Sequence, residues 1–447
     1  MMDFIKVLFG KKTTPRKQLL KVETLRIVVA EFVEYGNHNF GQSLVKLLQK
    51  NPIFNVHYFT EPFDKNFLSL QGRHFFDLSD TGNEILQKLN ADVVIWGYQE
   101  NEYIRLNFQT ANAYSDWDNV SCSILDSLYI PAEHFEHVNF FPEALEKLIT
   151  GFIATAISEQ RIDLKHLKQK LLKSVITKFN VSGPSNTNNN AMLLPYTMNA
   201  IGLIYLDYNQ KELNPKNFEI SKELFNKALQ QKEHIMQNVH IGCIYKNLGQ
   251  LFETALKQEL GSHWVLFKEA ITSYRTAQKY IDHYNYPYDF ALISFKLSLL
   301  YFRYWKFTND IQALRDAVFF LREAEKTYNQ ISFPELWSKI EGYLGFYLSL
   351  LGLFSKSNDI SRLAIKSYKN KQTVYRKELF PVMWAKIQEN IANVYYNMGK
   401  NSHDKSSFQE AIDYYQSALK VYENKHMHQE ITIVNNSIDK VMRAWKG

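Results

Sequence analysis

The sequence predicts a multidomain chain, with a small N-terminal α/β (α+β) domain followed by an all-α solenoid of helical hairpins. Three observations favour this fold class. Glycine and proline are scarce, with 17 and 11 residues among 447, which disfavours β-sandwiches, barrels and long disordered linkers. The runs that predict strands all come before residue 131. After residue 190, similar residues recur at long, regular intervals, which is typical of repeat architectures.

The N-terminal part alternates predicted strands and helices. Residues 1–23 are expected to be a flexible terminus, and residues 24–160 to form the α/β domain. The order β-α-β-α-β-β-β-α indicates a small layered fold. Strands are predicted at 25–33, at 54–60, in DVVIWGYQ and YIRLNFQT, and at 123–130, with helices at about 40–49, 83–89 and 142–158.

Residues 161–190 are predicted to be a basic helix and a polar linker. RIDLKHLKQKLLKSVITK, which spans 161–178, contains six Lys or Arg and one acid, Asp163. Its apolar residues recur at helical spacing, so the lysines are expected to form the solvated face of the helix. VSGPSNTNNN, at 181–190, is rich in turn residues and predicts the linker.

Residues 191–425 contain five related segments. IGLIY begins at 201 and IGCIY at 241, and LSLLY, LGFYL and IANVY follow from 297, 344 and 391, the last three 47 residues apart. Pro287, Pro334 and Pro381 keep the same interval. The wider gap between 241 and 297 is interpreted as an insertion of nine residues around QLFETALKQ.

Each segment holds two apolar-periodic stretches, which predicts five helical hairpins. In each, a small residue lets two helices approach and a neighbouring aromatic residue fills the space beside it. A hairpin cannot bury its apolar face alone, so such units stack. In residues 426–447 the apolar residues again recur at helical spacing, which predicts a C-terminal capping helix.

The repeats resemble the tetratricopeptide repeat (TPR), in which a hydrophobic–Gly pair with Tyr three positions on is followed by Ala, Phe or Tyr, and Ala in the second helix. The period of 47, rather than 34, departs from that family. IVVAEF and NADVVIWGYQ resemble the N-terminal α/β domain of bacterial repeat proteins, akin to the TolB N-terminal domain. That resemblance implies an assembly module without chemistry of its own.

Composition excludes several classes. Two cysteines, Cys122 and Cys243, are too few for a disulfide framework and favour a reducing, cytoplasmic location. No apolar stretch is long enough to span a membrane, although the N-terminal Phe4, Ile5, Leu8 and Phe9 leave weak membrane-surface contact open as an alternative. The net charge of +6 is mild, so nucleic-acid binding through the 161–178 helix is the less favoured interpretation.

No constellation of catalytic or metal-binding residues is apparent in the sequence. The loop Gly36–Ser43 approaches a phosphate-binding motif but has Gln42 where that motif needs lysine. His134 and His137, like His426 and His428, lack a third ligand nearby. We therefore expect a chain that is not an enzyme and has no cofactor or metal, and keep an anion- or nucleotide-binding enzyme in the N-terminal domain as an alternative.

The favoured hypothesis is a scaffold or adaptor that binds a protein, as a peptide or a helix, on the concave face of the repeats. In TPR-like hairpins the leading helices line that face, which implies which positions contact a ligand. The residues predicted to bind peptide are Asn199, Lys246, Asn247, Phe295, Leu299, Arg303, Phe346, Asn393 and Asn397.

Overall fold

The structure is a computed structural model. It describes residues 23–32, 40–62, 75–100, 103–110, 127–131, 143–157, 161, 163–182, 195–209, 214–235 and 237–446. The chain divides into two compact units. We call Arg16–Ile293 the N-terminal unit and Ser294–Gly447 the C-terminal unit, and describe each by itself.

The N-terminal unit begins with a five-stranded sheet in the order β2-β1-β3-β4-β5. β1 (Leu25–Glu31) pairs in parallel with β2 (Phe54–Pro62) and with β3 (Val93–Glu100). β3 and β4 (Tyr103–Thr110) form an antiparallel hairpin, and β5 (Leu128–Pro131) pairs antiparallel with β4. The predicted small α/β region is therefore confirmed, with β5 shorter than expected in the described residues.

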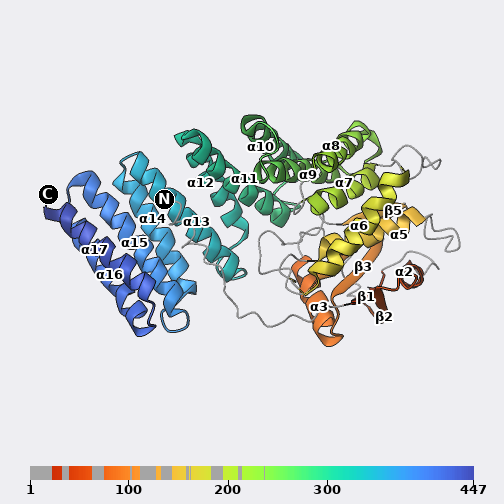
Figure 1. Cartoon of the computed structure of the whole chain (residues 1–447), viewed down its shortest axis with the longest axis horizontal. Helices are drawn as coiled ribbons and strands as arrows, with labels where there is room; N and C mark the ends of the chain where they lie inside the picture. Colours follow the sequence, from red (N-terminus) through yellow and green to blue (C-terminus); the bar gives the residue numbers. More distant parts are fainter. Residues whose placement is uncertain are drawn as a thin grey trace. The chain divides into compact units, whose positions relative to one another are not determined.

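Both faces of this sheet are covered, which explains the continuous β-branched run in β1. Ile27 and Val29 are completely buried on one side, and Val28 is buried on the other. Val28 belongs to a cluster with Trp96 and with Ile85 of α3 (Phe75–Lys88), a helix that begins well before the predicted residue 83. The remaining helices of this region are α2 (Phe40–Leu48), α5 (Glu143–Ala156) and α6 (Lys165–Ser182) (Figure 1).

One expectation for α6 is wrong. Its lysines were predicted to face solvent, and Lys165, Lys170 and Lys173 are exposed, but Lys168 is only 3% exposed. Its Nζ donates to the backbone O of Ile157 at 2.9 Å and lies 3.0 Å from a carboxylate oxygen of Asp207. The prediction failed because the following helix, which carries Asp207, packs against α6.

Two helical hairpins complete the N-terminal unit. α7 (Pro195–Asn209) pairs with α8 (Pro215–Gln230), and α9 (Asn238–Lys257) with α10 (His263–Tyr280). At the α7–α8 crossing the Ser221 hydroxyl donates to the Gly202 carbonyl, and a Cβ on Gly202 would lie 2.6 Å from Phe225. This close approach requires glycine.

The second hairpin differs from the sequence-based alignment. The glycine that meets the partner aromatic residue is Gly249, where an added Cβ would lie 2.8 Å from Tyr274. Gly242, in IGCIY, instead faces Ile281 and Tyr280. LGQLF, from Leu248, therefore takes the place assigned to IGCIY, and the supposed insertion is part of α9. The shift of seven residues is two helical turns, so both segments share one face.

The C-terminal unit consists of paired helices and a final single helix. The helices are α11 (Pro287–Thr308, shared with the N-terminal unit), α12 (Ile311–Thr327), α13 (Pro334–Phe354), α14 (Asn358–Val374), α15 (Pro381–Ser402), α16 (Lys405–Asn424) and α17 (His428–Lys446). Asp310, Ser357 and Asp404 cap the N-termini of α12, α14 and α16. The predicted pairing of helices is confirmed, and Gly345 against Tyr368 repeats the Gly249–Tyr274 contact.

Candidate functional site

The leading helices of the C-terminal unit are buried on most sides and carry one narrow row of partly exposed side chains. On α13 this row contains Lys339, Tyr343 and Leu350, with the buried Phe346 between them. Spacings of three and four place these side chains on one helix face. We call this set, with its equivalents one repeat earlier and later, the leading-helix row. It consists of Lys296, Leu299, Arg303 and Lys306 on α11, Lys339, Tyr343, Phe346 and Leu350 on α13, and Lys386, Asn390, Asn393, Asn397 and Lys400 on α15.

Ring contacts join neighbouring helices along the row. The Phe295 ring of α11 meets Tyr343 of α13 edge-on, with centroids 5.5 Å apart. Phe302 meets Phe346 in the same way, also at 5.5 Å. α13 in turn packs against α15. The row is therefore continuous over three helices.

The structure places five of the nine predicted peptide-binding residues in this row. Leu299, Arg303, Asn393 and Asn397 are partly exposed, and Phe346 is 6% exposed. The Asn393 amide is already engaged, because its Nδ2 donates to the Glu389 carbonyl and its Oδ1 accepts from the Tyr415 hydroxyl, each at 2.8 Å. A sixth, Phe295, is 2% exposed and packs between α11 and α13.

The other three predicted residues, Asn199, Lys246 and Asn247, belong to the first two hairpins; Asn199 is partly exposed and the other two are buried. Asn247 is completely buried and its Nδ2 donates to the Oδ1 of Asn199 at 2.8 Å; Lys246 is 5% exposed. Asp207, the equivalent of Arg303, is held by Lys168 of α6. The helices α5 and α6 and the edge strand β5 all pack against α7.

A small enclosed cavity lies where the sheet edge meets α7 and α9. Its volume is about 20 Å³, enough for one water molecule. Tyr129 of β5, Tyr196 of α7, and His240 and Cys243 of α9 line it. The His240 Nδ1 lies 3.1 Å from the Tyr196 hydroxyl, and its Nε2 has no hydrogen-bond partner in the described part of the chain. Burial, with the positive charge of Arg105, lowers the pKa of His240 to about 3, so the ring is neutral near pH 7.

The row of the C-terminal unit is strongly basic. Six of its members are Lys or Arg and none is Asp or Glu. Within the described residues, Lys296, Lys306 and Lys386 form no ion pair. The trailing helices differ, because there Arg322, Lys326 and Arg362 each pair with an acid three residues away, at 2.6 Å.

Two carboxyl groups, one buried and one partly exposed, lie beside the row. Glu341 of α13 is completely buried and accepts a hydrogen bond from the Asn370 Nδ2 at 2.5 Å. Burial, with the neighbouring Glu325, raises its pKa to about 7. Burial also raises the pKa of Glu389 to about 7, while the Tyr422 hydroxyl donates a hydrogen bond to it. Both carboxyls are therefore partly protonated near neutral pH and offset little of the row's positive charge.

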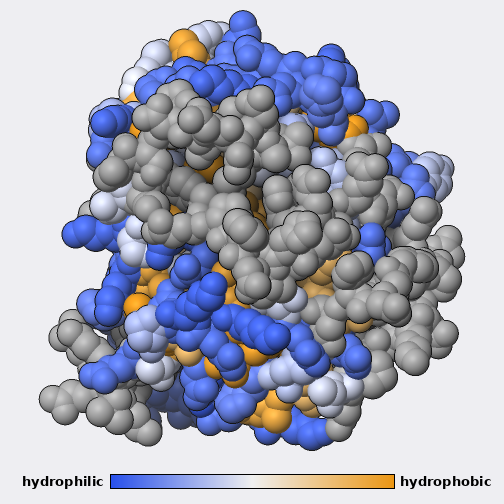
Figure 2. Space-filling model, turned by 90° about the vertical axis from the view of Figure 1, so that its right-hand side faces the viewer, coloured by the Kyte–Doolittle hydropathy of each residue, from blue (hydrophilic) through white to orange (hydrophobic). Residues whose placement is uncertain are grey.

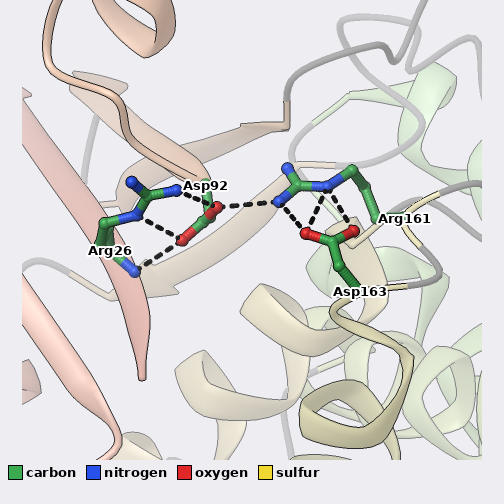
Figure 3. Close-up of polar contacts among 4 residues, drawn as sticks. All are labelled: Arg26, Asp92, Arg161 and Asp163. Carbon is green, nitrogen blue, oxygen red and sulfur yellow. Dashed lines mark hydrogen bonds and ion pairs between the residues drawn. The ribbon is translucent and has the colours of Figure 1, made fainter. Parts of the chain in front are cut away.

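A second charged cluster has a structural role (Figure 3). Asp92, at the start of β3, is 1% exposed and accepts hydrogen bonds from the Arg26 backbone N–H and guanidinium and from Arg161, at 2.9–3.0 Å. Asp163 holds Arg161 from the other side at 2.7 Å. Burial raises the pKa of Asp92, but these hydrogen bonds outweigh it and the pKa lies below its usual value. The cluster ties the segment before α6 to the sheet.

The sequence offered no signal for several of these groups. Asp92, Arg26 and Arg161 are far apart along the chain, and His240 belongs to no motif. The cations of the row could have been found by aligning α11, α13 and α15 on the 47-residue interval, because Lys339 and Lys386 then coincide. Only Lys246 and Arg303 were singled out among basic residues.

The alternatives raised by the sequence gain no support from the described residues. In them no three His, Cys, Asp or Glu side chains converge to hold a metal. Gly36 and its neighbours up to residue 39, and His134 and His137, lie outside the described residues. None of the described helices combines the length and apolar character needed to cross a membrane. Hydrophilic side chains make up most of the coloured surface at the sheet-bearing end of the chain (Figure 2).

No protein-family model matches the chain, and no curated protein matches it either. The arrangement of the row and its charges is thus the basis for a functional hypothesis.

Proposed function

We propose that this chain is a non-enzymatic interaction scaffold that binds a segment of another protein along the leading-helix row of α11, α13 and α15. The observation that carries the proposal is the difference between the hairpins. In the first hairpin, other parts of the same chain already contact the equivalent positions, through Lys168 at Asp207 and Tyr129 at Tyr196, although Asp207 keeps partial exposure. In the described residues of the C-terminal unit, the row remains partly exposed.

The chemistry of the row supports a protein partner. A side chain such as Leu350 offers apolar contact, and partly exposed amides such as Asn397 can donate to and accept from a peptide backbone. The paired helices support the TPR-like interpretation of the repeats, with the α/β region as an assembly module. Scarce cysteine supports a reducing, cytoplasmic location.

Site-specific photocrosslinking tests the proposal. A photoreactive amino acid replaces Leu350 in the row of the full chain, and Leu363 in the matched control. Leu363 is 48% exposed on the trailing helix α14. We expect discrete protein adducts in cells from position 350 and none from 363. Equal labelling from the two positions, or no adduct from 350, would refute the proposed surface.

A further inference from the structure

The first two hairpins show which chemistry the row accepts. There its occupant is a known part of the same chain. At the Asp207 position the occupant supplies an opposite charge, since Lys168 lies 3.0 Å from the carboxylate. About three helical turns earlier on α7, Tyr196 has the Tyr129 ring 5.2 Å from its own, and the Tyr129 ring also lies 4.5 Å from that of His240 on α9. The occupant thus combines charge complementarity with apolar contact.

In the C-terminal unit the sign of the charge is reversed. Where α7 has Asp207, α11 has Arg303, and the row adds Lys296 and Lys306 on the same helix. Lys386 and Lys400 continue the basic character on α15. The two carboxyls described beside the row each accept a hydrogen bond from the trailing helix, Glu341 from Asn370 of α14 and Glu389 from Tyr422 of α16. The pKa of each is raised to about 7. An occupant with negative charge is therefore favoured.

The aromatic side chains distinguish a protein segment from a nucleic acid. Single-stranded nucleic acids need ring faces on which bases can stack. Here Phe302 is stacked on Tyr347, with centroids 4.5 Å apart, and Phe346 is buried between helices. The partly exposed Tyr343 is also engaged, edge-on with Phe295 at 5.5 Å. Other exposed side chains between the cations are aliphatic or amide, as at Leu350 and Asn397.

We propose that the row of the C-terminal unit binds an acidic protein segment whose carboxylates alternate with apolar side chains. This rests on the proposed function, because it names the partner for the same surface. Three leading helices packed about 10 Å apart span about 20 Å. About six extended residues cover that distance, and a segment of about ten reaches past all three.

Fluorescence anisotropy with synthetic probes tests the partner class on the full chain. The probe is a labelled peptide of about ten residues that alternates Glu with Leu and Tyr. Two companions carry Gln or Lys in place of Glu, and an oligouridylate of equal charge serves as the nucleic-acid arm. The test variant is K296Q/K306Q/K386Q. The control, R315Q/K366Q/K420Q, removes the same charge from exposed positions of trailing helices.

We expect the Glu peptide to bind most tightly and the row variant to weaken it about tenfold, as three partly exposed charge contacts would. The control should change its affinity less than twofold. If the Gln or Lys peptide binds as well and Leu350→Asp abolishes that binding, the scaffold function stands and the acidic partner is wrong. The proposal is also overturned if the oligouridylate binds more tightly than the Glu peptide and the row variant abolishes that binding. It is overturned as well if the wild type binds the Glu peptide no more tightly than the row variant does.

Discussion

The buried imidazole of His240 should make the N-terminal unit sensitive to mild acid. Its ring is 4% exposed, lies against Tyr129 and Tyr196, and is near the positive charge of Arg105. Burial lowers the pKa to about 3 in the folded chain, from an ordinary value of 6.5. Because the folded state disfavours the proton, stability is complete above pH 6.5 and falls as the pH is lowered from 6.5 towards 3. At pH 5 the loss through this group is about 2 kcal/mol.

Urea unfolding of the wild-type chain and of His240→Asn, followed by far-ultraviolet circular dichroism at pH 7 and pH 5, measures this loss. Asparagine keeps a group that can bond to Tyr196 but does not titrate. We expect the variant to lose about 2 kcal/mol less than the wild type between the two pH values. His234→Asn is the matched control, since the His234 side chain is 63% exposed. Equal pH dependence in the wild type and the His240 variant would refute the reasoning.

Three further outcomes are expected from the same unfolding measurements. Asp92→Asn should cost about 3 kcal/mol, because it removes the 1% exposed carboxylate that accepts hydrogen bonds from both Arg26 and Arg161. Asp163→Asn, at a 27% exposed side chain, should cost less, and equal costs would contradict the assigned roles. Glu341→Gln should raise the free energy of unfolding by about 1–3 kcal/mol relative to the wild type at pH 8, and by little at pH 5. The raised pKa of the carboxyl costs the wild type stability as the pH rises from 4.5 through 7. A gain that does not change with pH would contradict this explanation. Ala364→Leu and Ala411→Leu, both completely buried, should each cost about 1–3 kcal/mol by overpacking a helix crossing, and unchanged melts would place these alanines on the surface.

Much of the fold could be predicted from local patterns, since each element carries its own periodicity. The β-branched run of β1 and the 47-residue interval of Pro287, Pro334 and Pro381 are signals of this kind. The register of the second hairpin could not be predicted, because IGCIY and LGQLF both place a glycine on the same face of α9. Only the partner Tyr274 selects Gly249.

The candidate site was predictable in part, for a related reason. The leading helices were identified correctly, but position alone does not say what covers a side chain. Asn247 and Arg303 were assigned the same role, yet Asn247 is completely buried while Arg303 remains partly exposed. Two things separate them: the alignment of α9 was seven residues out of register, and Asn247 faces α7, where it bonds to Asn199.

The covering of the first two hairpins has a consequence for how the chain could change in length. The elements that pack against the first hairpin, including α6 and β5, belong to the sheet-bearing region. This packing limits the number of hairpins that can stand at that place in the chain. Beyond α10 each 47-residue block supplies its own leading helix, crossing residue and capped trailing helix. Duplicating one such block would lengthen the exposed row by one helix spacing without changing the sheet. The number of hairpins would then set the length of the protein segment that the row can bind.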